Sequence, residues 1–141
     1  MNSIVNANRA PRAVGSYPHA RRVGNLLFLS GVGPRDPVDN SVPGNVNGPD
    51  GRLQSYDMEA QCRQVFANVR AVLEASGARW EDLVDVTVFL TDMQADFATY
   101  NRIYSEYFTD AQPCRTTLGI SALPTPIAIE LKCVAAIESA S

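Results

Sequence analysis

The sequence has few residues that bind metals or carry charge. It has a single histidine, and its three cysteines are scattered with no CxxC or Cys/His spacing. This pattern predicts neither a metal site nor a disulfide framework. Charged residues make up only 19% of the 141 positions, below the roughly one quarter that is usual in soluble domains. A chain so poor in charge often buries part of its surface in an oligomer.

Long apolar runs and an excess of positive charge are also missing. No stretch is long enough to span a bilayer, and positions 1–12 contain no apolar core like that of a secretory signal. The formal net charge is −3, which does not favour a phosphate backbone as partner, and solvated arginines account for a local basic cluster at 9–22. We therefore expect a cytoplasmic protein with reduced thiols, and neither a membrane nor a nucleic acid as its partner.

Alternating apolar residues predict strands in a single domain that covers positions 1–141. The alternation is clearest in the valines and leucine of 84–90. Gly24-Asn25, between two extended runs, is a hairpin signal. The predicted strands cover 20–22, 26–30, 84–90, 116–121 and 127–137.

Apolar residues at helical spacing predict two helices. The first is expected to begin at a cap on Ser55 or Asp57 and to end at Gly77. The second is expected to begin at a cap on Asp96 and to run to about Phe108. Its aromatic residues favour packing in the core over a base-stacking surface.

The resulting order, β-β-α-β-α-β-β, predicts an α+β fold with both helices on one face of a single sheet. Nothing remains in the chain to cover the other face, so self-association is expected. Positions 34–54, before the first helix, are rich in proline and glycine and predict a long loop. A loop of this length in a compact domain is usually functional or mobile, and the residues leave open whether it is a lid.

Two charged residues near the C-terminus stand out because the sequence around them is apolar and strand-like. Arg115 opens a β-prone run, and Glu130 interrupts the alternation of Ile127, Ile129 and Leu131. A charge in such a strand needs a partner, water or a ligand. A guanidinium can hold a carboxylate by two parallel hydrogen bonds, and a carboxylate can move protons or orient water. A structural ion pair or exposed edge charges account for the pattern equally well.

These residues resemble the signature of the RidA/YjgF/UK114 family of small imine and enamine deaminases. Matching motifs occur in the family's order along nearly the whole chain, at positions 10–17, 24–31, 86–101, 113–116, 123–124 and 129–131. The resemblance implies a chorismate-mutase-like fold with a mixed sheet. It also implies a homotrimer whose sheets face inward and whose sites lie between subunits.

The resemblance further implies roles for individual residues. In the family's chemistry an enamine acid tautomerises to an imine, water attacks the carbon, and ammonia leaves. As the catalytic residues, Arg115 would hold the substrate carboxylate and Glu130 would place the water and move protons. Thr117 is expected on the same strand face as Arg115. The further candidates for substrate binding are Tyr17, Ser30, Thr117 and His19.

Two departures from the family pattern favour a larger substrate. The 34–54 loop is longer than usual, and an extra residue lies near Gln94. Together with the Ser-Tyr-Pro-His stretch at 16–19, they make the chain most similar to the 2-aminomuconate deaminase branch. A diacid would need a second polar anchor. His19 is the preferred candidate because it neighbours Tyr17, and Arg35 is the other.

The favoured interpretation is a cofactor-free, homotrimeric hydrolase. It would convert 2-aminomuconate to 4-oxalocrotonate (2-oxohex-3-enedioate) and ammonia in the breakdown of aromatic compounds. The alternatives are a general 2-aminoacrylate (2-iminopropanoate) deaminase, a non-enzymatic ligand-binding trimer, and an RNA-cleaving protein, which the acidic charge balance opposes.

Overall fold

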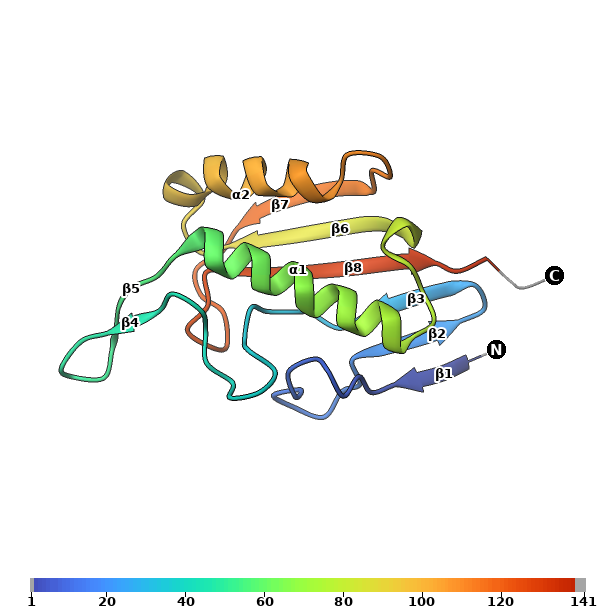
Figure 1. Cartoon of the computed structure of the whole chain (residues 1–141), viewed down its shortest axis with the longest axis horizontal. Coiled ribbons are helices and arrows are strands. Elements are labelled where there is room, and N and C mark those ends of the chain that lie inside the picture. Colours follow the sequence, from blue (N-terminus) through green and yellow to red (C-terminus); the bar gives the residue numbers. More distant parts are fainter. Residues whose placement is uncertain (1, 139–141) are drawn as a thin grey trace.

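A six-stranded mixed sheet forms the centre of the computed structural model, which describes residues 2–138 (Figure 1). The strand order is β1-β2-β3-β8-β6-β7, and only β6 and β7 run parallel. Helices α1 and α2 lie on one face of the sheet, so the predicted α+β fold is confirmed. The bounds are β1 (Asn2–Val5), β2 (Ala20–Val23), β3 (Leu26–Leu29), α1 (Met58–Ala75), β6 (Leu83–Leu90), α2 (Met93–Tyr107), β7 (Cys114–Gly119) and β8 (Ile129–Ala136).

Four short elements were not predicted. Strand β1 pairs antiparallel with β2 at the edge of the sheet. Its four residues, Asn-Ser-Ile-Val, are too few to show an alternation. Within the long loop, β4 (Val46–Asn47) and β5 (Leu53–Ser55) form a two-stranded ribbon that extends away from the body (Figure 1). A 3₁₀ turn, η1 (Trp80–Asp82), leads into β6.

Helix α1 follows the prediction closely. Its N-cap is Asp57, whose Oδ1 accepts the N–H of Ala60 at 3.1 Å. After the helix, Gly77 has φ +75°, a left-handed conformation that glycine adopts without strain. The apolar stripe faces the sheet and is buried. Its members include Met58, Cys62, Val65, Phe66, Val69, Val72 and Leu73.

The predicted cap of the second helix was wrong. Helix α2 is capped by Asp92, whose Oδ1 accepts the N–H of Ala95 at 3.1 Å. Asp96 lies inside the first turn, is buried, and accepts the Tyr56 hydroxyl at 2.5 Å. Asp92 and Asp96 both precede apolar residues, so the local sequence suits either as a cap. Only the tertiary contact with Tyr56 shows that Asp96 is a buried hydrogen-bond acceptor and not the cap. Burial raises the pKa of the Asp96 carboxyl.

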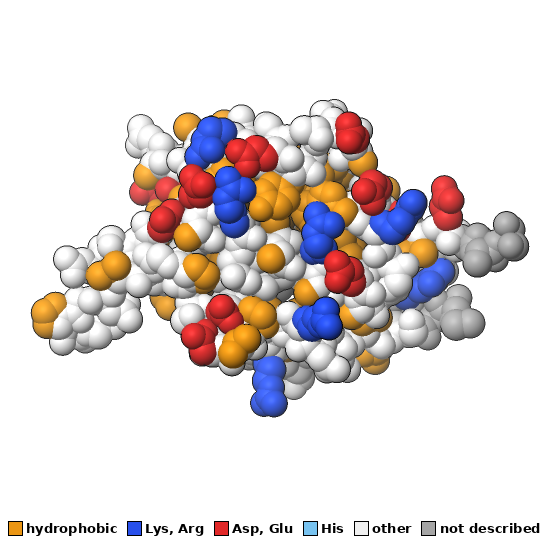
Figure 2. All heavy atoms as spheres, in the orientation of Figure 1, with side chains coloured by type: hydrophobic (Ala, Val, Ile, Leu, Met, Phe, Trp, Pro, Cys, Tyr) orange, Lys and Arg blue, Asp and Glu red, His pale blue; other side chains and the backbone are white. Residues whose placement is uncertain are grey.

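Most aromatic residues of α2 and its C-terminal end pack in or against the core, as expected, whereas Phe97 is 38% exposed. The packed residues form a cluster with Phe66 and Trp80 in which ring centroids lie 4.4–6.2 Å apart, mostly in edge or tilted contacts. On the outside, the helices carry interspersed arginines and acids (Figure 2). Arg63, for example, bridges Glu59 at 3.2 Å and Glu106 at 3.0 Å. This side of the molecule therefore looks like an ordinary solvated surface.

The other face of the sheet is different because nothing in the described chain covers it. In β6, Val86, Val88 and Leu90 point to the helices and are fully buried, so the intervening residues point the other way. That second face, here called the open face, carries large apolar side chains that are 38–44% exposed. They include Val23, Leu26, Phe28 and Leu118.

Candidate functional site

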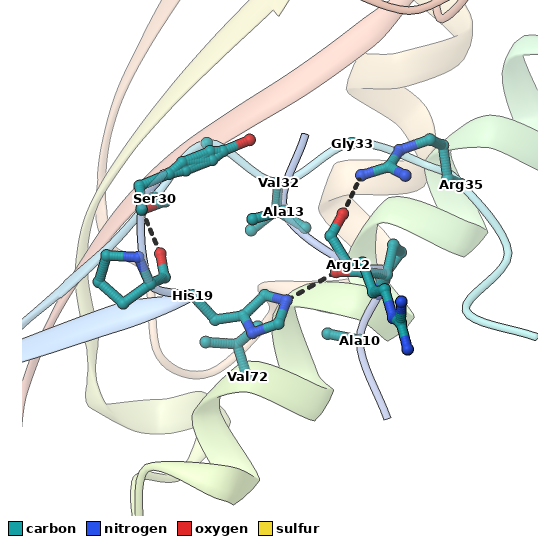
Figure 3. Close-up of a pocket in the computed structure, with 13 residues that line it drawn as sticks. Ala10, Arg12, Ala13, His19, Ser30, Val32, Gly33, Arg35 and Val72 are labelled. Carbon is teal, nitrogen blue, oxygen red and sulfur yellow. Dashed lines mark hydrogen bonds between the residues drawn. The ribbon is translucent and has the colours of Figure 1, made fainter. Parts of the chain in front are cut away.

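Two adjoining cavities lie between the N-terminal segment, the chain after β3 and the start of β8. One holds Glu130 and has a volume of about 50 Å³, enough for a few water molecules. The other, shown in Figure 3, is lined by His19, Ser30 and Val72 among others. The residues that line both cavities are Tyr17, Gly31, Gly33 and Arg35.

Glu130 is the second residue of β8 and pairs with Phe89 on the open face. The backbone at Gly31 passes so close that a Cβ there would lie 2.9 Å from Glu130 Oε2. No side chain of residues 2–138 neutralises this half-buried carboxyl, and burial is the one influence that raises its pKa. A carboxyl group whose pKa is raised toward neutrality, beside a cavity large enough for water, is suited to general acid–base chemistry.

Tyr17 and Ser30 line the cavities, but their hydroxyls already organise the N-terminal segment. The Tyr17 hydroxyl accepts the N–H of Val14 at 3.2 Å. The Ser30 hydroxyl donates to the carbonyl of Pro18 at 2.6 Å (Figure 3). The Ser30 hydroxyl can therefore still accept a hydrogen bond from a ligand, whereas its proton is already donated to Pro18.

His19 is at the cavity wall, but both of its ring nitrogens are occupied. Nδ1 accepts the N–H of Ala7 at 2.9 Å, so the ring proton is on Nε2, which donates to the carbonyl of Pro11 at 2.6 Å (Figure 3). The imidazole thus links His19 by hydrogen bonds to Ala7 and Pro11, in the segment before β2. This geometry contradicts the expectation that His19 offers a free donor for a second carboxylate.

Arg115 lies in a separate cluster, between β7 and α2. Its Nη1 donates to Asn101 Oδ1 at 2.8 Å, and its guanidinium lies over the rings of Tyr104 and Tyr100, 4.8 and 5.4 Å from their centroids. Thr117 shares this face, as predicted, and its Oγ1 is 2.7 Å from the Tyr100 hydroxyl. All of these partners are uncharged, so the positive charge of Arg115 remains available to an anion.

Arg115 and Glu130 do not meet within one chain. Arg115 pairs with Val86, which points to the helices, whereas Glu130 pairs with Phe89 on the open face. The two side chains therefore leave the sheet on opposite sides, with β6 between their strands. One chain therefore holds two separate clusters, named here the Arg115 half (Arg115, Thr117, Tyr100, Tyr104, Asn101) and the Glu130 half (Glu130, Tyr17, Gly31, Arg35).

Two buried polar residues of α1, Gln61 and Asn68, position the Glu130 half and were not predicted. Asn68 donates to the carbonyls of Gly33 and Arg35, both at 2.8 Å. Gln61 accepts the N–H of Ala128 at 2.8 Å and donates to Asn45 at 3.1 Å. Together they hold both ends of 33–45 and the chain just before β8 against the helix. The sequence did contain an indication of this role, because Gln61 and Asn68 are polar residues that interrupt the apolar stripe of α1.

Residues 2–138 contain neither a metal-binding cluster nor a membrane-spanning helix. No group of three histidine, cysteine, aspartate or glutamate residues there is arranged to hold a metal ion. No helix in that range is apolar and long enough to cross a bilayer. Of the cysteines, Cys62 and Cys133 are buried, which raises the pKa of each thiol to about 12, and Cys114 is exposed.

The comparison with known proteins identifies the family. A family model described as "Endoribonuclease L-PSP" matches residues 7–137. The chain belongs to this family. It is the RidA/YjgF family that the sequence motifs indicated, because its relatives carry those names.

Three relatives show how far the similarity extends. Reactive Intermediate Deaminase A of Arabidopsis thaliana is 38% identical over 132 residues, which is 94% of this chain and 64% of that protein. The crystal structure of the E. coli YjgF gene product superimposes with a TM-score of 0.81 at 33% identity, over 95% of this chain and 98% of that one. The crystal structure of E. coli TdcF with bound serine superimposes with a TM-score of 0.83 at 29% identity, over 96% of this chain and 99% of that one.

Proposed function

We propose that this protein is a hydrolytic deaminase of a small enamine or imine acid, and that its preferred substrate is 2-aminomuconate. The observation that carries the proposal is Glu130, a half-buried carboxyl with a raised pKa and a cavity for water beside it, which no side chain of residues 2–138 neutralises. A relative that is named for deamination of reactive intermediates agrees with this chemistry.

The reaction needs one water molecule and no redox partner. The enamine gains a proton at carbon and loses one at nitrogen, and so becomes an imine. Water then adds its oxygen to the imine carbon while the Glu130 carboxylate accepts the released proton. That proton is passed to the nitrogen, which gives a carbinolamine; when the hydroxyl proton follows it to the nitrogen, the carbon–nitrogen bond breaks, a carbonyl forms and ammonia leaves. Glu130 ends the cycle as a carboxylate, so the same residue acts first as base and then as acid.

A complete site requires a second copy of the chain. Arg115 would hold the carboxylate next to the reacting carbon, but it leaves the sheet on the side opposite to Glu130. Because the exposed apolar residues of the open face also need a cover, we propose a homotrimer with the sheets facing inward. The Arg115 half of one copy would then adjoin the Glu130 half of the next. Light scattering that gave a monomer at micromolar concentration would contradict this arrangement.

A second candidate substrate is 2-aminoacrylate, which has three carbons. The observation in its favour is that a relative of known structure, TdcF, holds serine, a three-carbon amino acid. The long loop of this chain favours the six-carbon diacid instead, because Arg35 at its start lines the Glu130 cavity. The non-enzymatic alternative predicts binding of such acids without turnover.

Ammonia release by the purified protein tests the proposal. Both enamines are unstable, so each is generated in the cuvette by a coupled enzyme. We expect release from 2-aminomuconate with a higher kcat/KM than from 2-aminoacrylate, and no more than the background rate with Glu130→Gln. A preference for 2-aminoacrylate would reject the diacid. Ammonia release from neither substrate would reject the deaminase.

A further inference from the structure

We propose that Arg35 binds a second carboxylate of the substrate, at the end away from the reacting carbon, and so determines the preference for a diacid. This inference rests on the proposed function of the Glu130 cavity. Arg35 is in the same chain as Glu130 and lines the same cavity, together with Tyr17 and Gly31. It also lines the adjoining cavity (Figure 3).

The charge of Arg35 has no counter-ion among the described residues. The side chain is half-buried, and its guanidinium donates to two neutral acceptors, the carbonyl of Arg12 at 2.7 Å and the amide oxygen of Asn40. No carboxylate of residues 2–138 lies within 4.0 Å of it, whereas Arg63, Arg79 and Arg102 all have acidic partners. A half-buried guanidinium that has only neutral acceptors is a binding group for an anion.

The surrounding loop holds Arg35 in position before a ligand arrives. Buried Asn68 binds the carbonyl of Arg35 at 2.8 Å and fixes the backbone there. The next residues close a tight turn, because the N–H of Asp36 donates to Ser41 at 2.6 Å and that of Asn40 donates to Asp36 at 2.8 Å. The Asp36 carboxylate is turned to the N–H of Val38 at 2.8 Å. A guanidinium that is already oriented loses little freedom when it binds a carboxylate.

The other cations near the site are less suited to this role. Both ring nitrogens of His19 are bonded to backbone groups. Arg115 belongs to the other cluster, where it would hold the first carboxylate. Arg12 also lines the adjoining cavity, but its side chain is exposed. Its charge makes the local potential more positive, but its guanidinium is not held in a defined orientation toward the site.

The first test compares two substrates in one protein. In Arg35→Ala we expect kcat/KM for 2-aminomuconate to fall about 10- to 100-fold, the effect of losing a hydrogen bond to a charged group, while that for 2-aminoacrylate changes less than about twofold. Arg52→Ala is the matched control, because Arg52 belongs to the same long loop and its side chain is 89% exposed. Equal changes for both substrates in Arg35→Ala would overturn the inference.

Two further variants separate binding from loop structure. Arg35→Gln keeps a donor for the Arg12 carbonyl but removes the charge, so it should lose the diacid preference as Arg35→Ala does. Restored preference in Arg35→Gln would mean that Arg35 only supports the loop. Asn40→Gly removes the amide oxygen that orients the guanidinium, and glycine tolerates the φ of +69° at that position. We expect it to raise KM for the diacid by a few-fold and to leave kcat unchanged.

A binding measurement keeps this inference independent of turnover. Calorimetry with adipate, a saturated six-carbon diacid, should show at least tenfold weaker binding to Arg35→Ala than to wild type, with propanoate as the monoacid control. If no ammonia is released but this difference is found, the deaminase proposal fails and the anion site stands. If wild type and Arg35→Ala bind adipate equally, or wild type does not bind it, the anion site fails whatever the turnover assay gives.

Discussion

The Arg115 half and the Glu130 half are built in opposite ways. In the Arg115 half, a cation on an edge strand is held over two tyrosine rings and by Asn101, all on one helix. In the Glu130 half, a carboxyl that no side chain of residues 2–138 neutralises lies where three non-helical segments converge, and Gly31 lets the backbone approach it closely. The cation is supported by regular structure, and the carboxyl depends on loops. Each half lacks the charge that the other half carries, so the proposed reaction would need both.

The Glu130 half should carry the chemical step. Glu130→Gln keeps the shape of the side chain and removes the base, so kcat should fall by roughly 10²–10⁴-fold with little change in KM. Steady-state ammonia release measures both constants. Glu81→Gln, at an exposed position, is the control for loss of one negative charge. An unchanged kcat in a folded Glu130→Gln protein would leave Glu130 with a structural role only.

The Arg115 half should carry substrate binding. Removing a desolvated charged contact costs on the order of 2–5 kcal/mol, so Arg115→Ala should lower kcat/KM by roughly 30- to several thousand-fold. Arg115→Lys should be nearly as damaging, because an ammonium lacks the planar fork. Circular dichroism would verify folding of both variants. Full activity of Arg115→Ala, or full rescue by lysine, would contradict this assignment.

Mixing the two inactive variants tests whether the halves come from different copies. In a cyclic trimer of Arg115→Ala and Glu130→Gln chains, every hybrid contains one site in which both residues are intact. Random mixing at equal amounts should therefore restore about a quarter of wild-type activity, since about three quarters of the trimers are hybrids and one site in three works. Co-expression with two different tags gives the hybrids. No recovery in purified hybrids would mean that both residues act within one chain.

The close approach at Gly31 should matter more to activity than to folding. A Cβ at this position would lie 2.9 Å from the Glu130 carboxylate and would displace it. We expect Gly31→Ala to lower kcat about tenfold, the cost of a misplaced catalytic group. Gly15→Ala is the matched control in the N-terminal segment, because a Cβ there meets nothing within 4 Å. Equal kcat values for the two variants would show that the carboxylate can move without loss.

The smallest expected effect is on thermal stability, and the direction in which it changes with pH follows from the raised pKa of Glu130. Burial raises the folded pKa of Glu130 above its ordinary 4.5, so ionised Glu130 destabilises the folded state above the folded pKa. Below pH 4.5 the carboxyl is protonated in both states and this cost disappears. Glu130→Gln should therefore melt a few degrees higher than wild type at pH 7, and the difference should vanish as the pH falls below 4.5. Thermal unfolding followed by circular dichroism across pH 3.5–8 checks this; a lower melting temperature for the variant at pH 7 would contradict it.

The sequence singled out individual candidate residues but could not show how they are arranged. Arg115 and Glu130 stood out because they are charges in apolar strands, and strand periodicity already placed Thr117 beside Arg115. The periodicity of the sequence could not show that both ring nitrogens of His19 are hydrogen-bonded, to Ala7 and to Pro11, because these contacts join segments that fold back on each other. The same limit applied to Asp96, which looked like a helix cap and is a buried partner of Tyr56.

Local order was determined by the sequence itself. The cap at Asp57, the apolar stripe of α1, the left-handed turn at Gly77 and the alternation in β6 are short-range features, and their physics depends on neighbours a few residues away. The tertiary structure alone decided which charges share a cavity. The hydrogen bond from Asn68 holds the backbone at Arg35 next to the Glu130 cavity. The register in which β7 and β8 pair with β6 places Arg115 and Glu130 on opposite faces of the sheet. Such placements depend on strand order and register, which long-range packing selects and no single segment encodes.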